Sequence, residues 1–174
     1  ISGQPLEASE SDLRAAERAD ADGSYGGERL AIEALIAAYG GQTEHAIQVS
    51  REALDRLPQD DLFFRSLIAG HLGLAYVYRG DVRQGPPVLR EALRVSRRVG
   101  NVTISVLMLC HLAEMALIRG EYDQAMVDLD EALEEAVDAA GQPQPIAGYA
   151  LIQKGRVLVE WRRFDEARRH LEEG

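Results

Sequence analysis

The stretch GEYDQAMVDLDEAL, residues 120–133, decides the fold because its pattern recurs along the chain. GQTEHAIQVSREAL begins at Gly41 and GDVRQGPPVLREAL begins at Gly80, and both end in the same Glu-Ala-Leu triplet. A fourth copy, RRFDEARRHLEEG, begins at Arg162, so that successive copies start 39, 40 and 42 residues apart. Self-similarity at a period of this length is typical of repeat proteins, in which each repeat is one supersecondary unit.

Each repeat is predicted to hold a first (A) helix and a second (B) helix. In the first copy, ERLAIEALIAAY at residues 28–39 places its apolar side chains on one face at helical spacing, and later repeats carry more uniformly apolar segments there. The B helices are expected at about 43–56, 82–99, 122–140 and from 164 onward. No segment alternates as a strand does, so the sequence predicts an all-α protein.

A recurring pair of small residues supports the helix pair as the unit. A small residue lies twelve positions before each small residue of the B helix, in the pairs Ala34 and Ala46, Gly73 and Gly85, Ala113 and Ala125, and Gly155 and Ala167. Small side chains at two facing points let helices approach closely. The pattern therefore predicts antiparallel helix pairs that stack into a right-handed superhelix, an α-solenoid, with a concave face.

We expect a single helical-repeat domain over residues 1–174, as a fragment of a longer chain. The helix pairs are expected at 28–58, 63–100, 102–141 and 145–174, the last of them truncated. Residues 6–20 are interpreted as a B helix left over from a preceding pair.

The amino-acid composition and net charge of the chain disfavour some classes of protein. The 174 residues carry a net charge of −10 with 46% hydrophobic residues, which suits a folded globular protein. An acidic chain disfavours direct contact with nucleic acid, because neutralising phosphates needs a basic surface. No apolar run is long enough to span a bilayer, so we expect a cytoplasmic protein without membrane contact.

Catalytic and metal-binding residues are not expected. The histidines are scattered one to a repeat, at His45, His71, His111 and His170, without the spacing of a zinc site. His71 and His111 share the same register in their repeats, which favours packing or helix-face roles over a metal or catalytic role. Because no phosphate-binding loop or catalytic constellation occurs either, we expect neither an enzyme nor a cofactor in this region.

The segment HLGLAYVYRGDVRQGPPVLREAL, residues 71–93, resembles the tetratricopeptide (TPR) repeat. The period of about 40 exceeds the roughly 34 residues of the ordinary repeat. From about residue 27 onward, segments such as ALDRLPQDD, SRRVGNV and HLAEMALIRGEYDQA are similar to the sensor region of MalT-like regulators, the large ATP-binding transcription factors of the LuxR family. The resemblance implies a region that senses a small-molecule inducer or a regulatory protein. The alternative is a general protein-interaction scaffold that holds a peptide or another subunit.

The resemblance also implies where a ligand or partner would bind, because in TPR arrays the A helices line the concave groove. Transferring the groove positions gives Glu28, Tyr39, Tyr78, Cys110, Glu114, Tyr149, Arg156 and Glu160. Tyrosines with a few charged groups suit a sugar-like ligand or an extended peptide, although core packing is the alternative for any single one. Glu114 and Arg156 are charges on otherwise apolar helices, so we expect them to approach each other and anchor a polar ligand. Exposed apolar ends of the array would also allow self-association.

Charge alternates between neighbouring B helices. The helix expected at 122–140 is acidic, whereas the B helix before it carries Arg90, Arg94 and Arg97. We expect salt bridges between them on the outer face, each contributing about 0–1 kcal/mol, with a protein-docking patch as the alternative.

Overall fold

The computed structural model describes residues 26–173, which form eight helices and no strand. The helices are α2 (Gly26–Tyr39), α3 (Thr43–Arg56), α4 (Leu62–Arg79), α5 (Gly85–Arg98), α6 (Val102–Ile118), α7 (Tyr122–Glu135), α8 (Ile146–Glu160) and α9 (Phe164–Glu173). The predicted all-α solenoid is therefore confirmed. The helix predicted at 6–20 lies outside the described residues. No helix in the described part is both long enough and apolar enough to cross a membrane.

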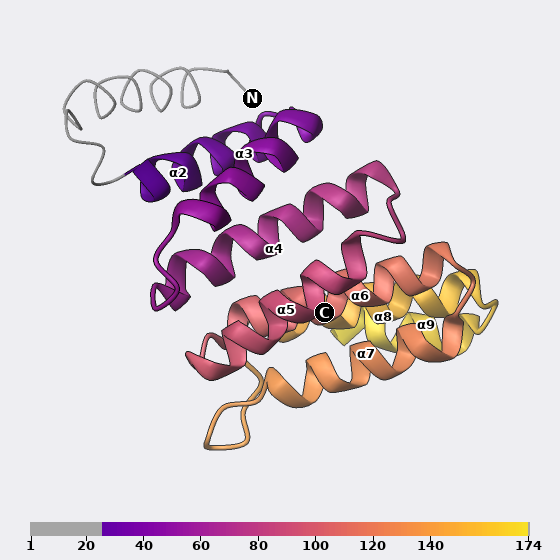
Figure 1. The fold of residues 1–174 in the computed structure, drawn as a ribbon. Coiled ribbons are helices and arrows are strands. Elements are labelled where there is room, and N and C mark those ends of the chain that lie inside the picture. The colour runs from indigo at the N-terminus through magenta and orange to yellow at the C-terminus, as the bar shows by residue number, and fades with distance from the viewer. Residues whose placement is uncertain (1–25, 174) are drawn as a thin grey trace.

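The helices stack as pairs, with α2, α4, α6 and α8 as A helices and α3, α5, α7 and α9 as B helices. Figure 1 shows α2 and α3 at one end of the stack and α8 and α9 toward the other. The backbones of consecutive A helices approach one another closely, whereas those of the B helices in residues 26–173 lie further apart and are bridged only by long side chains such as Arg97. The more closely spaced layer of a curved array is its inner side, so the A helices form the inner face and the B helices the outer face.

The small residues predicted to mark close approach are buried at the packing points. Ala34 and Ala46 of the first pair are 0% and 1% exposed, and Ala113 and Ala125 of the third are 1% and 0% exposed. At Gly85, an added Cβ would lie 2.7 Å from Met115 Cε and 3.3 Å from Tyr76 Cβ. A side chain there would separate α5 from α4 and α6, which explains the selection of glycine.

The glycine that opens each repeated stretch has a separate cause. Gly41, Gly80 and Gly120 follow A helices and adopt φ values of 72°, 70° and 76°. This left-handed conformation ends a helix and is strained for residues that carry a Cβ. The fourth copy has Arg162 at this position with a φ of 60°, so the backbone geometry is retained without the glycine.

Two predicted B helices are shorter than expected. The helix expected at 82–99 begins at Gly85, because the Asp81 carboxylate accepts hydrogen bonds from the backbone N–H groups of Arg83 (3.2 Å) and Gln84 (3.0 Å) and forms a turn. The helix expected at 122–140 ends at Glu135. There the Asp138 carboxylate accepts from the N–H groups of Ala140 and Gln142, both at 2.8 Å, which favours a turn over helix.

One arginine of α5 forms the predicted salt bridges to the neighbouring B helix on the outer face, whereas Arg94 pairs with Glu91 of its own helix. Arg97 of α5 lies 2.5 Å from Glu131 of α7 and also pairs with Glu135. The guanidinium is 40% exposed, so the contribution to stability is at the low end of the range for surface pairs.

Candidate functional site

The predicted groove residues lie on A helices, but their environments differ. Tyr39 and Tyr78 stand at the carboxyl ends of α2 and α4 and are 75% and 70% exposed. Cys110 is buried in α6, whereas Glu28, Glu114 and Tyr149 are partly buried. Arg156 and Glu160 are exposed on α8. The inner face therefore combines protruding aromatic rings with recessed polar groups.

Glu114 and Arg156 approach each other from successive A helices, as predicted. Arg156 Nη2 lies 3.9 Å from Glu114 Oε1, and Arg156 Nη1 donates a hydrogen bond to Gln153 Oε1 at 2.7 Å. At 3.9 Å the two charges attract each other without a direct hydrogen bond. The Glu114 carboxylate and the Arg156 guanidinium can therefore each form a hydrogen bond with a bound ligand.

Tyr149 of α8 lies within electrostatic reach of three other predicted residues. Burial raises the pKa of the Tyr149 phenol, Cys110, Glu114 and Tyr78 raise it further, and a hydrogen bond with Gln153 acts in the opposite direction. The phenol is thus protonated at neutral pH and can donate a hydrogen bond. The structure brings Tyr78, Cys110, Glu114, Tyr149 and Arg156 into one neighbourhood.

His111 extends this neighbourhood and was interpreted from sequence only as a packing residue. Its side chain is 8% exposed, and its Nδ1 lies 3.9 Å from Glu114 Oε2. Nδ1 has no hydrogen-bond partner in the described part of the chain. The adjacent His111 imidazole lowers the pKa of Glu114, burial opposes this effect, and the charge of Arg156 lowers the pKa further. Glu114 is therefore ionised at neutral pH.

The two histidines of equal register lie near each other on α4 and α6. The pKa of His71 is lowered chiefly by burial and also by the charge of His111, while a hydrogen-bonding contact of Nδ1 with the Leu67 carbonyl (2.8 Å) acts in the opposite direction. The His71 ring meets the Tyr39 ring edge-on, with 5.7 Å between centroids. A line of polar and aromatic groups thus crosses the inner face from α2 to α8.

The arrangement supports binding through hydrogen bonds and ring contacts. No group of three His, Cys, Asp or Glu side chains within residues 26–173 is placed to hold a metal ion. An acceptor carboxylate, a donor guanidinium, a donor phenol and an unsatisfied imidazole nitrogen converge from α6 and α8. Such a mixture of a few polar groups beside aromatic surface suits recognition of a polar ligand or a peptide.

The family model described as the MalT-like TPR region matches residues 27–174 of this chain. The chain belongs to the MalT-like TPR region family. The HTH-type transcriptional regulator MalT of Serratia proteamaculans (strain 568) is 24% identical over 144 residues, which are 83% of this chain and 16% of that protein. MalT of Yersinia enterocolitica is 23% identical over 137 residues, 79% of this chain and 15% of that protein. This MalT-like TPR region thus spans about a sixth of the length of the curated relatives it matches.

Among solved structures, the crystal structure of BtubC (BKLC) from P. vanneervenii is similar to this MalT-like TPR region, with a TM-score of 0.73 at 18% identity. The match covers 96% of this chain and 69% of that one. At this identity the likeness concerns the fold, and it agrees with the stacked helix pairs.

Three residues near the candidate site were missed in the sequence of this MalT-like TPR region, and their shared position in the repeat could have indicated them. His71, His111 and Gln153 occupy the same register on α4, α6 and α8, and each lies beside a predicted groove residue or another member of the series. A register that is polar in three consecutive A helices, on otherwise apolar segments, points to a shared face of the array.

Proposed function

We propose that this MalT-like TPR region is the signal-sensing part of a bacterial LuxR-family transcription regulator. It would bind a small-molecule inducer or a regulatory protein on its inner face, without catalysis, a cofactor or DNA contact of its own. The similarity to MalT regulators over 83% of the chain supports the regulatory role. A cytoplasmic location is part of this proposal, since such regulators act where bacterial DNA lies.

The observation that carries the proposal is the loose Glu114–Arg156 pair beside the unsatisfied His111 nitrogen. A buried polar atom without a partner costs stability, and binding a ligand group there would recover part of that cost. A hydroxyl or amide placed between His111 Nδ1 and Glu114 could hydrogen-bond to both. Arg156 and Tyr149 would then hold a second polar group of the same ligand.

A thermal-shift screen against sugars, nucleotides, amino acids and short peptides tests this proposal. A specific ligand at 100 times its dissociation constant adds about 2.7 kcal/mol of stability. Hits are expected to weaken in Glu114→Gln and Arg156→Ala when binding is measured by calorimetry. Arg168→Ala, a matched change of an exposed arginine on α9, should bind as the wild type does. Equal binding by all three variants would refute an inner-face site.

The second candidate function is a general TPR interaction scaffold without a small-molecule ligand. It is favoured by the exposure of Tyr39 and Tyr78, at 75% and 70%, because protruding rings suit an extended peptide better than an enclosed metabolite. This scaffold would be favoured if no small molecule shifted the melting temperature and if a peptide bound and its binding were weakened by Tyr39→Ala and Tyr78→Ala.

A further inference from the structure

Two grooves at equivalent positions lie on the outer face of the described residues, because the backbones of successive B helices are not in close contact. The first outer groove lies between α3 and α5 and has α4 as its floor, and its lining residues are Leu54, Arg65, Ala69, Leu72, Pro87, Val88, Glu91 and Val95. The second outer groove lies between α5 and α7 over α6 and is lined by Arg90, Leu93, Arg94, Arg97, Leu109, Leu112, Asp128 and Glu131. Both lie on the side of the array opposite the inner-face site.

The second outer groove is bridged by the protein's own charges. Arg97 reaches across it from α5 to Glu131 and Glu135 of α7. Arg90 on the same wall exerts an electrostatic effect on Asp128 of the opposite wall. The charged groups of this groove therefore already have partners within the array.

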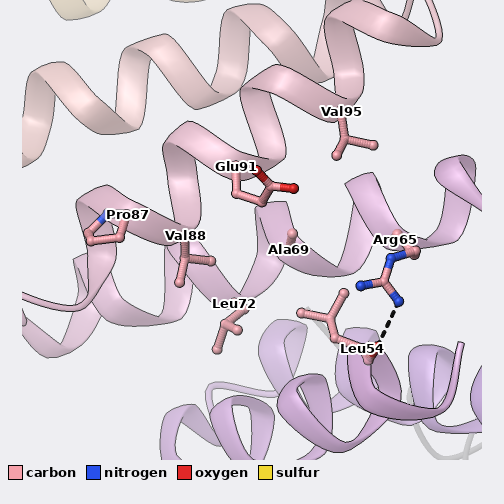
Figure 2. Close-up of a pocket in the computed structure, with 8 residues that line it drawn as sticks. All are labelled: Leu54, Arg65, Ala69, Leu72, Pro87, Val88, Glu91 and Val95. Carbon is pink, nitrogen blue, oxygen red and sulfur yellow. Dashed lines mark hydrogen bonds between the residues drawn. The ribbon is translucent and has the colours of Figure 1, made fainter. Parts of the chain in front are cut away.

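The first outer groove lacks the arginine that bridges the second one. In the register of the repeat, Pro58 stands at the position of Arg97, while Val88 and Val95 stand at the positions of Asp128 and Glu135. Three charged side chains of the second outer groove are thus replaced by apolar ones, whereas Arg51 and Glu91 retain the charges of Arg90 and Glu131. Figure 2 shows Leu54, Ala69, Leu72, Val88 and Val95 around the resulting apolar groove, which has a volume of about 260 Å³.

Two charged side chains line the first outer groove, Arg65 near Leu54 and Glu91 between Val88 and Val95, and further arginines act on Glu91 (Figure 2). Arg65 Nη1 donates to the carbonyl oxygens of Leu54 (2.7 Å) and Leu57 (3.1 Å), which holds its guanidinium beside the groove (Figure 2). Glu91 pairs with Arg94, with Nε–Oε2 and Nη2–Oε1 distances of 2.8 and 2.5 Å. The pKa of Glu91 is lowered chiefly by Arg94 and further by the charges of Arg65 and Arg98. The charges of three guanidinium groups thus act on the one carboxylate that lines this groove.

The spacing of the lining residues suits a helix laid along the groove. On the floor helix α4 they recur as Arg65, Ala69 and Leu72, and on the wall helix α5 as Val88, Glu91 and Val95, so the floor and one wall present ridges at helical intervals. Ridges of this kind accept the side chains of a third helix at positions i, i+3 or i+4, and i+7. A volume of about 260 Å³ admits a few such side chains rather than a whole enclosed ligand.

We propose that the first outer groove docks an acidic amphipathic α-helix of a partner protein. The apolar stripe of that helix lies on the partly exposed Leu54 and Val88, above the buried Ala69 and Leu72, and carboxylates beside the stripe face Arg65 and Arg98. The positive charges of Arg65, Arg94 and Arg98 around Glu91 favour an acidic over a basic helix. This inference is independent of the inner-face ligand, because the groove lies on the opposite side of the array.

The test uses the full chain and a labelled synthetic helical peptide of about 16 residues with leucines at i, i+3, i+7 and i+10 and flanking glutamates. Binding is followed by fluorescence anisotropy. Two control peptides have the leucines shuffled out of helical register or the glutamates replaced by lysines. Both are expected to bind at least about tenfold more weakly, because they lose the stripe or meet like charges. Equal binding by either control, or no binding of the probe peptide, would overturn the proposal.

Two variants of the chain locate the site. Val88→Asp restores the carboxylate found at the equivalent position of the second outer groove and should weaken binding by about tenfold. Arg98→Glu changes an exposed side chain, so the fold should be retained, and should weaken binding about fivefold. The matched controls are Val127→Asp, at a 58% exposed valine of α7, and Arg168→Glu on α9.

The controls should bind within about twofold of the wild type, since neither residue lines the groove. Unchanged binding by Arg98→Glu and Val88→Asp, both folded by circular dichroism, would refute the assignment. The alternative is that the chain self-associates through this groove. Self-association would then be abolished by Val88→Asp and would not be displaced by the peptide. This result would identify a second copy as the occupant and would also overturn the proposal.

Discussion

Gly73 and Gly155 hold the same position in the A helices α4 and α8, yet alanine at the two sites should have opposite effects on stability. An alanine Cβ at Gly73 would lie 2.8 Å from Leu89 Cγ and still closer to one Leu89 Cδ. Leu89 is fully buried, so it has no free space to move into. At Gly155 the Cβ would lie 2.5 Å from Leu171 Cγ, but Leu171 is 43% exposed and can rotate into solvent.

The magnitudes follow from two opposing contributions. Replacing glycine by alanine inside a helix stabilises it by about 1 kcal/mol. Inserting a methyl group into a well-packed core costs about 1–3 kcal/mol. With a packing cost near 2 kcal/mol, Gly73→Ala should lower the free energy of unfolding by about 1 kcal/mol. Gly155→Ala should raise it by up to about 1 kcal/mol, because Leu171 relieves the contact.

Urea denaturation followed by circular dichroism measures both effects in one assay. The two substitutions are chemically identical and each serves as the control for the other, since helix propensity contributes equally to both. If Gly73→Ala stabilised the protein as much as Gly155→Ala did, the contact with Leu89 would not be tight, and the explanation of the twelve-residue spacing would be wrong.

Three further predictions follow from single residues. Arg162 has a φ of 60°, a left-handed conformation that is strained for a residue with a Cβ. Arg162→Gly should therefore raise the free energy of unfolding by about 1 kcal/mol in urea denaturation. A lower free energy of unfolding in this variant would show that Arg162 is not strained. Burial and the charge of Glu114 raise the pKa of the Cys110 thiol to about 12, so a thiol reagent should modify it only after unfolding, and rapid reaction of the native protein would contradict this. The folded-state pKa of Glu114 lies below its ordinary 4.5, so its contribution to stability is present above pH 4.5 and is lost as the pH falls. In Glu114→Gln the free energy of unfolding should therefore fall less steeply below pH 4.5, as measured by urea denaturation at several pH values. The same pH dependence in the variant and the wild type would show that Glu114 makes no such contribution.

Helix pairs could be predicted well because their signals are local. The B helix at 43–56 was predicted within its observed bounds, Thr43–Arg56. The predictions were less accurate where side chains compete with the helix for backbone N–H groups, as Asp81 and Asp138 do. Charge pattern, spacing and repeat register together also predicted that Arg97 bridges to the acidic helix α7.

The candidate site was predicted only in part. Register transferred from the repeat placed Glu114 and Arg156 on facing A helices, and they lie 3.9 Å apart. It did not reveal that His111 would be buried beside Glu114 with an unsatisfied nitrogen, since burial depends on how α4, α6 and α8 stack. It also did not show which outer groove is open, because this depends on side chains from three helices.

The sequence by itself determined the helical repeat, the family and the faces on which polar side chains lie. These follow from spacing along the chain, since a helix of about 3.6 residues per turn converts sequence intervals directly into faces. Only the tertiary structure decided which groups of different helices meet. The distance between consecutive A helices and the gap between B helices arise from the summed packing of many side chains. The pairing of Glu114 with Arg156 on the inner face and the apolar groove between α3 and α5 are both consequences of that packing.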